Sequence, residues 1–263
     1  MPVRTPSETL ELACNAGVAK AAVGGSRRFY RLALGSALAG AYIALGGALS
    51  IVVGFGCPEI TATNPGIQRL LSGLVFPIGL MLVVILGADL FTGNNALLIP
   101  PALRGKISWT RVLGNWTFVW LGNFVGALAV AWFLIYLAGV FAAPSYTTAV
   151  CNIAVTKASL GFWPIFLKGI GANWCVCLAV WLALSGRRLG EKLLACEIPV
   201  LAFVALGFEH CVANMFFIPL GMMYGADLTV ADLFANLIPA TLGNIAGGAL
   251  FVGLSQHYLY NEK

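Results

Sequence analysis

The scarcity of charged side chains limits the possible folds of this chain more than any other feature. Residues 32–58, 70–88, 112–156, 169–186 and 233–261 contain no Asp, Glu, Lys or Arg. An apolar helix needs about 20 residues to cross the hydrocarbon core of a bilayer. Charged residues make up only 10% of the chain, against roughly 25% in an ordinary soluble domain. The sequence therefore predicts an all-α integral membrane protein, and disfavours a disordered chain, a nucleic-acid-binding module or a disulfide-rich secreted domain.

We predict six membrane-spanning helices, of which the second and fifth are broken. The second is interrupted by Asp89, and the fifth by Glu209 and His210. Ionisable residues at this depth are costly and mark places where the backbone or the chemistry is unusual. The predicted spans lie near residues 30–55, 68–104, 110–140, 158–185, 192–223 and 229–258.

The basic residues predict the orientation, because Lys and Arg concentrate in cytoplasmic loops. With six spans, 12 of the 15 basic residues fall on one side. The other side keeps Arg69 and Lys157, and Lys168 lies within the fourth span. We therefore expect a multi-pass protein of the cytoplasmic membrane with both termini in the cytoplasm. The twelve are Arg4, Lys20, Arg27, Arg28, Arg31, Arg104, Lys106, Arg111, Arg187, Arg188, Lys192 and Lys263.

The N-terminal segment, residues 1–26, lacks the apolar core of a signal peptide. We expect a short amphipathic helix from Ser7 to Val23 that lies along the cytoplasmic face. Glu8 and Glu11 then fall near its N-terminus, where negative charge suits the helix dipole. A disordered tail is the alternative interpretation.

Two segments of the chain repeat one another. Residues 87–94 align with residues 207–214, so that glycine, an acid, a small residue and asparagine coincide. After each segment comes a pair of asparagines eight residues apart. These are Asn115 and Asn123 in the first half, and Asn236 and Asn244 in the second.

The repeat divides the chain into two halves of three spans each, residues 27–140 and 157–260. An odd number of spans forces the halves into opposite orientations, as in many transporters. Broken helices at membrane depth need surrounding protein or a water-filled cavity, so two breaks meeting from opposite sides describe a pore. The alternative is a pair of kinks at unrelated glycines. Aquaporins share this plan, but their Asn-Pro-Ala motif is missing, since Asn-Pro occurs once, at Asn64-Pro65.

Three ionisable residues at the breaks are candidates for function. His210 can exchange a proton near neutral pH, so we predict a pore role, with a satisfied core histidine as the alternative. Asp89 and Glu209 resemble a proton-relay pair. Their matching positions favour a structural role instead, in which each carboxylate accepts hydrogen bonds from N–H groups freed by its own break.

Two lysines leave several interpretations open. Lys157 is expected at the outer start of the fourth span, where it either draws anions toward the pore or snorkels to the surface. Lys168 lies deeper, where it snorkels, pairs with an acid or contacts another subunit. With two histidines and no Cys-x-x-Cys pair among seven cysteines, we expect no metal site, no cofactor and no disulfide. An intramembrane enzyme is the alternative class, and it lacks a clustered set of reactive groups.

Five motifs spread over nearly the whole chain resemble one family, the formate/nitrite transporters. The first repeat segment, residues 87–94, and the second, residues 207–215, both match its patterns. The motifs are Gly-Ala-Asp-Leu-Phe-Thr-Gly-Asn at 87–94, Gly-Asn-Phe-Val-Gly-Ala at 122–127, Ala-Asn-Trp-Cys-Val-Cys-Leu-Ala-Val-Trp at 172–181, Gly-Phe-Glu-His-Cys-Val-Ala-Asn-Met at 207–215 and Ile-Pro-Ala-Thr-Leu-Gly-Asn-Ile-Ala-Gly-Gly at 238–248.

The resemblance implies one channel domain, residues 1–263, with an aquaporin-like protomer and a homopentamer in which each protomer has its own pore. It implies a channel or transporter for small anions of weak acids. Formate is the expected substrate, with nitrite, hydrosulfide or lactate as alternatives. Protons and the lipid bilayer are the other expected partners, and nucleic acid is not one.

The resemblance also assigns residues to the pore. Leu90, Phe91 and Thr92 would form the loop that breaks the second span. His210 would lie between two hydrophobic constrictions, where a weak-acid anion could take a proton and cross as the neutral acid. The remaining assignments are Leu80 for the inner constriction, Phe76 and Phe203 for the outer one, Asn173, Thr92 and Asn244 as polar neighbours, Lys157 in the outer vestibule, and Asp89, Glu209, Asn94 and Asn214 as supports of the helix breaks.

Overall fold

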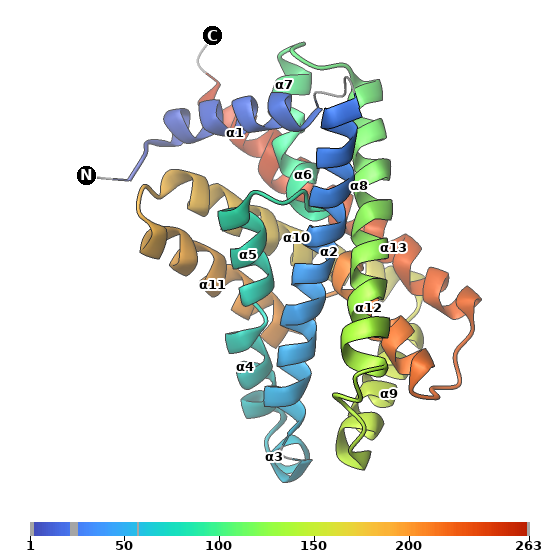
Figure 1. Cartoon of the computed structure of the whole chain (residues 1–263). Coiled ribbons are helices and arrows are strands. Elements are labelled where there is room, and N and C mark those ends of the chain that lie inside the picture. The colour runs from blue at the N-terminus through green and yellow to red at the C-terminus, as the bar shows by residue number, and fades with distance from the viewer. Residues whose placement is uncertain (1–2, 22–25, 57, 262–263) are drawn as a thin grey trace.

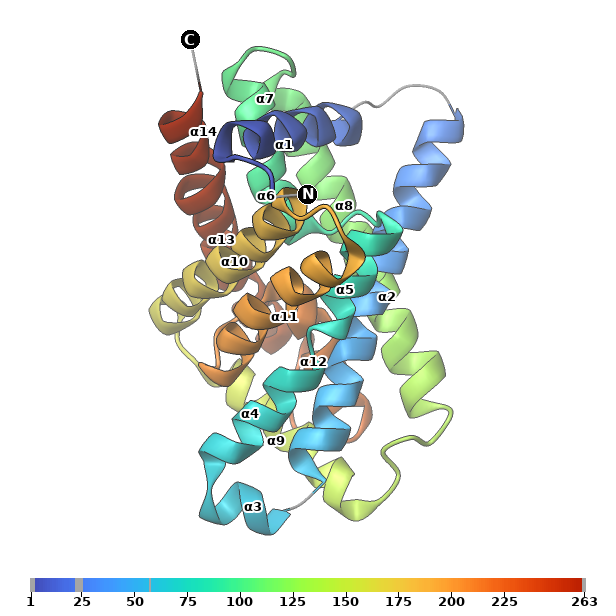
Figure 2. The same ribbon diagram turned by 90° about the vertical axis from the view of Figure 1, so that its left-hand side faces the viewer.

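The computed structural model describes residues 3–21, 26–56 and 58–261. These residues form helices joined by short loops (Figures 1 and 2). Val23 and Lys263, which the sequence predictions name, lie outside the described residues.

The first helix, α1 (Pro6–Ala21), lies across the ends of the long helices (Figures 1 and 2). It begins one residue before the predicted start, because Thr5 caps it. Thr5 Oγ1 accepts the N–H of Glu8 (3.3 Å), and Glu8 Oε2 accepts the N–H of Thr5 (2.7 Å). This reciprocal capping box has a sequence signature, Thr5-Pro-Ser-Glu8. The buried face of α1, which includes Leu10 and Cys14, packs on the protein's own helices.

The first half of the chain contains one unbroken long helix, one broken helix and one that ends in a π-helical segment. Many large apolar side chains on these helices are exposed, as expected where lipid surrounds a protein. Its elements are α2 (Ser26–Phe55), α3 (Pro58–Thr63), α4 (Pro65–Val75), α5 (Ile78–Leu86), α6 (Phe91–Leu97), α7 (Ile99–Leu103), α8 (Trp109–Ala129) and the π segment η1 (Val130–Tyr136).

The second half follows a similar order, again with a broken helix and a terminal π segment. Its first helix, α9, lies with α3 at one end of the molecule, whereas α1, α7 and α14 lie at the other (Figures 1 and 2). We call these the α3 end and the α1 end. The elements are α9 (Pro144–Ala158), α10 (Phe162–Ser185), α11 (Leu189–Ala205), α12 (Cys211–Met223), α13 (Val230–Gly248), η2 (Ala249–Leu254) and α14 (Ser255–Tyr260).

Five helical stretches within the described residues are long and apolar enough to cross a membrane. The remaining predicted span, the fifth at residues 192–223, is divided between α11 with 17 residues and α12 with 13 residues. Each of these is too short to cross alone. The five stretches are Ser26–Phe55, Pro65–Leu86, Trp109–Tyr136, Phe162–Ser185 and Val230–Tyr260.

Small residues allow the long helices to pack closely. A Cβ added to Gly40 of α2 would collide with the carbonyl oxygen of Asn123, and one added to Gly126 of α8 with that of Ala37. The α10–α13 pair uses Gly243 in the same way. Close backbone approach at glycine is the usual basis of helix association in membranes, where lipid is as apolar as leucine.

Each π segment packs on the short helix of the other half. The segment η2 contacts α6, and η1 contacts α12. At the first of these contacts, a Cβ on Gly253 would lie 2.8 Å from the carbonyl oxygen of Ala96. The two halves therefore interlock through elements that are far apart in sequence.

We predict that Gly126→Ala destabilises the protein, because the added methyl group collides with α2. The expected loss of unfolding free energy is about 1–3 kcal/mol, as for other overpacked contacts. Thermal unfolding of the purified protein in detergent measures it. Gly114→Ala in the same helix is the matched control, because a Cβ there meets no atom within 4 Å. Equal melting temperatures for the two variants would contradict the packing argument.

Candidate functional site

Two helix breaks meet in the middle of the molecule. At both, a glycine adopts a left-handed backbone conformation, Gly87 with φ 73° and Gly207 with φ 68°. This conformation favours glycine because it has no Cβ. The helix resumes at Phe91 in the first break and at Cys211 in the second. Phe91 is therefore already helical rather than part of the breaking loop as expected, and so is Thr92.

At the first break, the side chain of Asn123 replaces the missing helical hydrogen bonds. Its Oδ1 accepts the N–H of Phe91 (2.8 Å). Its Nδ2 donates to the carbonyl oxygens of Asp89 (2.9 Å) and Ser36 (2.7 Å). The N–H of Asp89 donates in turn to the carbonyl oxygen of Gly35 (3.2 Å). One amide side chain thus ties the break to its two neighbouring helices.

At the second break, Asn244 makes the same set of contacts. Its Oδ1 accepts the N–H of Cys211 (2.9 Å), and its Nδ2 donates to the carbonyl oxygens of Glu209 (2.9 Å) and Gly169 (2.8 Å). The N–H of Glu209 donates to the carbonyl oxygen of Lys168 (3.4 Å). Asn244 was expected to present a polar group to the pore. Because its amide binds backbone atoms on all sides, it clamps the break instead.

The carboxylate of the first break pairs with α1. Lys20 Nζ lies 2.7 Å from Asp89 Oδ1. Asn115 connects the same two elements, since it accepts from Asn94 Nδ2 (3.0 Å) and donates to the carbonyl oxygen of Lys20 (3.0 Å). The break and the end of α1 are therefore joined by an ion pair and an amide bridge.

The carboxylate of the second break has the corresponding partners. Lys157 Nζ lies 3.1 Å from Glu209 Oε1. Asn236 accepts from Asn214 Nδ2 (2.7 Å) and donates to the carbonyl oxygen of Lys157 (2.9 Å). Glu209 Oε2 also accepts from Asn214 (2.6 Å) and Asn236 (3.3 Å). Lys157 of α9 thus occupies the position that Lys20 of α1 has at the first break.

These contacts correct the prediction for Asp89 and Glu209. The freed N–H groups go to Asn123 and Asn244, and each carboxylate binds a lysine instead. Sequence reasoning missed Asn123 as a functional residue, although its eight-residue spacing from Asn115 was visible. It also missed Lys20 as the partner of Asp89, although a signal was present in the sequence. Residues 14–21 and residues 151–158 share Cys, Asn, Val, Lys and Ala at matching positions, which aligns Lys20 with Lys157.

His210 lies in the second break, with its ring directed at Thr92 of α6, and is only 1% exposed. Its Nδ1 caps α12 by accepting the N–H of Ala213 (3.1 Å), and its Nε2 lies 3.0 Å from Oγ1 of Thr92. A neutral imidazole has one donor and one acceptor nitrogen. Since Nδ1 accepts, the hydrogen of the neutral ring is on Nε2, which donates to Thr92.

Asn173 contacts the same polar centre through Thr92. Its Nδ2 lies within hydrogen-bond distance of the carbonyl oxygens of Asn244 (2.6 Å) and Thr92 (3.2 Å) and of Asn95 Oδ1 (3.0 Å). The thiol of Cys177 also donates to the Thr92 carbonyl oxygen (3.2 Å). Thr92 is thus held at both its backbone and its side chain.

Apolar side chains enclose this centre. Phe76 and Phe203 meet edge to face, with ring centroids 5.6 Å apart, and Phe203 stacks on His210 at 5.8 Å. Leu80 and Leu90 lie on the other side and line a different cavity. Phe91, expected at a constriction, is buried and lines neither of the two cavities described next.

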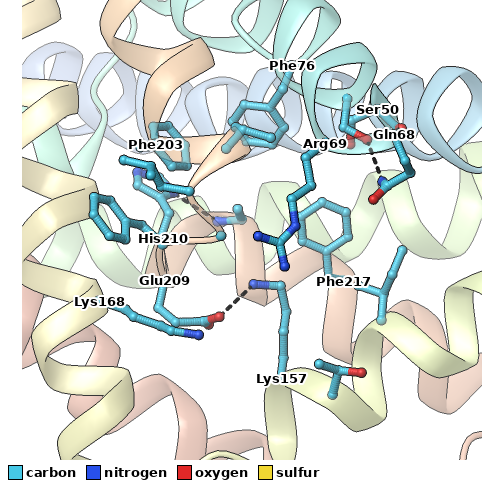
Figure 3. Close-up of a pocket in the computed structure, with 18 of the residues that line it drawn as sticks. Ser50, Gln68, Arg69, Phe76, Lys157, Lys168, Phe203, Glu209, His210 and Phe217 are labelled. Atoms are coloured by element: carbon cyan, nitrogen blue, oxygen red, sulfur yellow. Dashed lines mark hydrogen bonds and ion pairs between the residues drawn. The ribbon is translucent and has the colours of Figure 1, made fainter. Parts of the chain in front are cut away.

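A cavity opens on each side of the apolar barrier. The larger, of about 510 Å³, lies on the side of the α3 end and is lined by His210 and the phenylalanine pair, which Figure 3 shows, and by Phe55 at the end of α2. Arg69, Lys157 and Lys168 all line it. These are the three basic residues left over from the twelve on the predicted cytoplasmic side. We call it the α3-end cavity.

The smaller α1-end cavity has a volume of about 160 Å³, and Ala16 and Lys20 of α1 form part of its wall. It is lined by Leu80 and Leu90, and by Lys20 and Lys192. The sequence thus places lysine on both sides of the same apolar barrier. This arrangement can attract anions from either side and exclude bare ions in the middle.

Comparison with known proteins identifies the family of this site. The family model described as formate/nitrite transporter matches residues 7–258. The chain belongs to the formate/nitrite transporter family. The probable formate transporter of Methanothermobacter thermautotrophicus is 42% identical over 87% of this chain and 88% of its own length. The formate channel FocA of Escherichia coli K12 is 37% identical over 97% of this chain and 94% of its own length.

Solved structures agree with this membership. An FNT family ion channel matches with a TM-score of 0.88 at 33% identity, over 97% of this chain and 99% of that chain. A pentameric formate channel with formate bound matches with a TM-score of 0.81 at 34% identity, over 91% and 100%. The transporter is thus a multi-pass membrane protein, and its family of transporters favours a non-enzymatic function.

We predict that Lys157→Met destabilises the transporter more than Lys20→Met. Removing one partner of a buried ion pair costs about 3–5 kcal/mol. The Glu209 side chain is only 4% exposed, against 16% for Asp89. Water therefore solvates the unpaired carboxylate less well at the second break. Thermal unfolding in detergent measures both losses, with Lys192→Met as the control. A larger loss for Lys20→Met would show that burial does not set the cost.

Proposed function

We propose that the transporter is a channel for small monovalent anions of weak acids, with formate as the main substrate. One observation carries this proposal. A buried histidine with a polar centre lies between two apolar closures, and each closure is followed by a cavity lined with basic residues. The relatives named as formate channels support the choice of substrate.

The architecture we propose has six membrane crossings in two inverted halves, with both termini in the cytoplasm. The matching contacts of the two breaks support the inverted repeat, since Asn123 and Asn244 bind equivalent backbone atoms. Counting α11 and α12 as one broken crossing brings the five apolar stretches to six. The similarity to a pentameric formate channel supports a homopentamer, in which each protomer encloses its own pore.

In this proposal, the form in which formate crosses follows from the free-energy cost of moving a charge from water into an apolar constriction. A formate anion concentrates in a positively charged cavity, but the side chains of Phe76, Phe203, Leu80 and Leu90 offer it no polar group. Apolar constrictions resist bare ions more than neutral molecules. Formate that takes up a proton near His210 therefore crosses as formic acid and loses the proton on the far side.

The proton step, if it uses His210, has a structural requirement. A histidine that holds an extra proton needs hydrogens on both nitrogens, so Nδ1 must release the N–H of Ala213. The cap of α12 is then open for as long as the proton is held. This couples proton transfer to the first turn of α12, next to the clamp at Cys211.

Formate uptake into proteoliposomes tests the channel function. We expect uptake down a formate gradient that accelerates as the pH is lowered, with no chemical conversion of the substrate. Parallel assays with nitrite, hydrosulfide and lactate rank the alternatives. If nitrite or hydrosulfide enters markedly faster than formate, the proposed substrate is wrong while the family function remains. Conversion of the substrate would favour the enzyme hypothesis.

Two substitutions of His210 separate proton transfer from folding. Asparagine at this position places an amide oxygen where Nδ1 caps α12, but it cannot carry a proton; glutamine keeps a donor toward Thr92 but loses the cap. We expect His210→Asn to fold normally and to slow proton-coupled formate uptake on the order of 100-fold, the contribution typical of a general acid. His210→Gln should show the lower melting temperature. Unchanged pH-dependent uptake in a folded His210→Asn protein would refute the relay.

A further inference from the structure

The α3-end cavity has an unbalanced positive charge. It is lined by Arg69, Lys157 and Lys168, but among the described residues that line it only Glu209 is acidic. Glu209 is committed to Lys157, with 3.1 Å between Oε1 and Nζ. That pair cancels, which leaves two positive charges. The residue expected to attract anions, Lys157, is therefore the one whose charge is already neutralised.

The two remaining cations have no ion-pair partner within residues 3–21, 26–56 and 58–261. Both side chains reach into the cavity, Arg69 from α4 and Lys168 from α10 (Figure 3). Arg69 is exposed and Lys168 half-buried. Both are therefore accessible to a solute that enters the cavity.

The other break offers no counterpart for Lys168. The carbonyl oxygens of Lys168 and Gly35 accept the N–H groups of Glu209 and Asp89 respectively, so the two residues occupy matching positions. The side chain at this position is a cation in one half and a hydrogen in the other. The α3-end cavity is also about three times larger, with 510 Å³ against 160 Å³.

We propose that Arg69 and Lys168 form a binding site for small divalent oxyanions, in particular short dicarboxylates. A monovalent anion would leave one positive charge uncompensated, whereas a dianion neutralises both. The guanidinium of Arg69 can hold one carboxylate with two parallel hydrogen bonds, and the Lys168 ammonium acts as a point charge for the second. The cavity volume accommodates a three-carbon dicarboxylate such as malonate.

A bound dicarboxylate cannot continue through the protein. It carries two charges to be neutralised instead of one, and the edge-to-face contact of Phe76 and Phe203 closes the cavity beyond it. The ligand therefore competes with the transported anion from the α3 end and blocks uptake. This blocking effect rests on the proposed channel function, whereas binding to the cavity does not.

Calorimetric titration of the detergent-solubilised, full-length protein with malonate at low ionic strength tests the site. We expect malonate to bind the wild type more tightly than acetate does. Arg69→Gln and Lys168→Gln should each weaken malonate binding about tenfold, as the loss of one screened charge in contact implies. Arg27→Gln removes a charge at the α1 end and should leave binding unchanged. A single elution volume in size-exclusion chromatography shows that each variant is folded.

Either of two results overturns the site. Malonate that fails to bind the wild type at low ionic strength rules it out, and so does malonate affinity that Arg69→Gln and Lys168→Gln leave intact. In proteoliposomes, malonate should raise the KM for formate without lowering the maximal rate, and Arg69→Gln should relieve this inhibition. If the wild type moves no formate, the channel proposal fails, but the titration still decides the binding site.

Discussion

Backbone groups inside a membrane must find partners within the protein, and this requirement determines the centre of the structure. Lipid offers no hydrogen bonds, and each unsatisfied N–H or C=O costs several kcal/mol. Two helices that stop at Gly87 and Gly207 create such groups in the middle of the molecule. Asn123 and Asn244 resolve the problem, because one amide supplies an acceptor and two donor hydrogens in a single rigid plane.

The same requirement applies to the charges beside the breaks. A carboxylate at this depth is tolerated only when it is paired and hydrogen-bonded. Asp89 and Glu209 meet this condition with lysines from α1 and α9, neither of which is a membrane-crossing helix by the length of its apolar stretch. The peripheral helix α1 thereby contributes to the electrostatics of the α1-end cavity, which Lys20 lines. Removing the charge of Lys20 would change the field at Leu90, next to the barrier.

The sequence allowed most of the large-scale organisation to be predicted, because composition and the spacing of charges act on whole segments. The membrane class and the two helix breaks follow from uncharged stretches and from the repeated Gly, acid and Asn positions, and the family follows from the resemblance of five motifs. The partners of the polar side chains did not follow. Which N–H meets which amide depends on where α8 and α13 cross the breaks, and Asn123 lies 32 residues beyond the N–H that it binds.

The distribution of basic residues likewise predicted the orientation of the chain, but it did not predict the surroundings of individual residues. Twelve basic residues predicted an orientation, and the remaining three looked like exceptions. They share one cavity because α4, α9 and α10 converge there, which sequence order alone cannot reveal. Lys157 illustrates the limit most clearly, since its expected role depended on a free charge and the structure places a carboxylate 3.1 Å away.

The interlocking of the two halves through the π segments has a consequence for biosynthesis. Residues 91–97 of α6 pack on η2, which begins at Ala249, about 150 residues later in the chain. At typical rates of translation, roughly 10–30 s pass between the two. For about the first half of that interval, Asn95 and the carbonyl oxygen of Thr92 also lack Asn173, which follows them by 78 and 81 residues. The polar groups of the nascent first half therefore need water or another protein as partners. The insertion machinery must provide this environment until the second half has been synthesised.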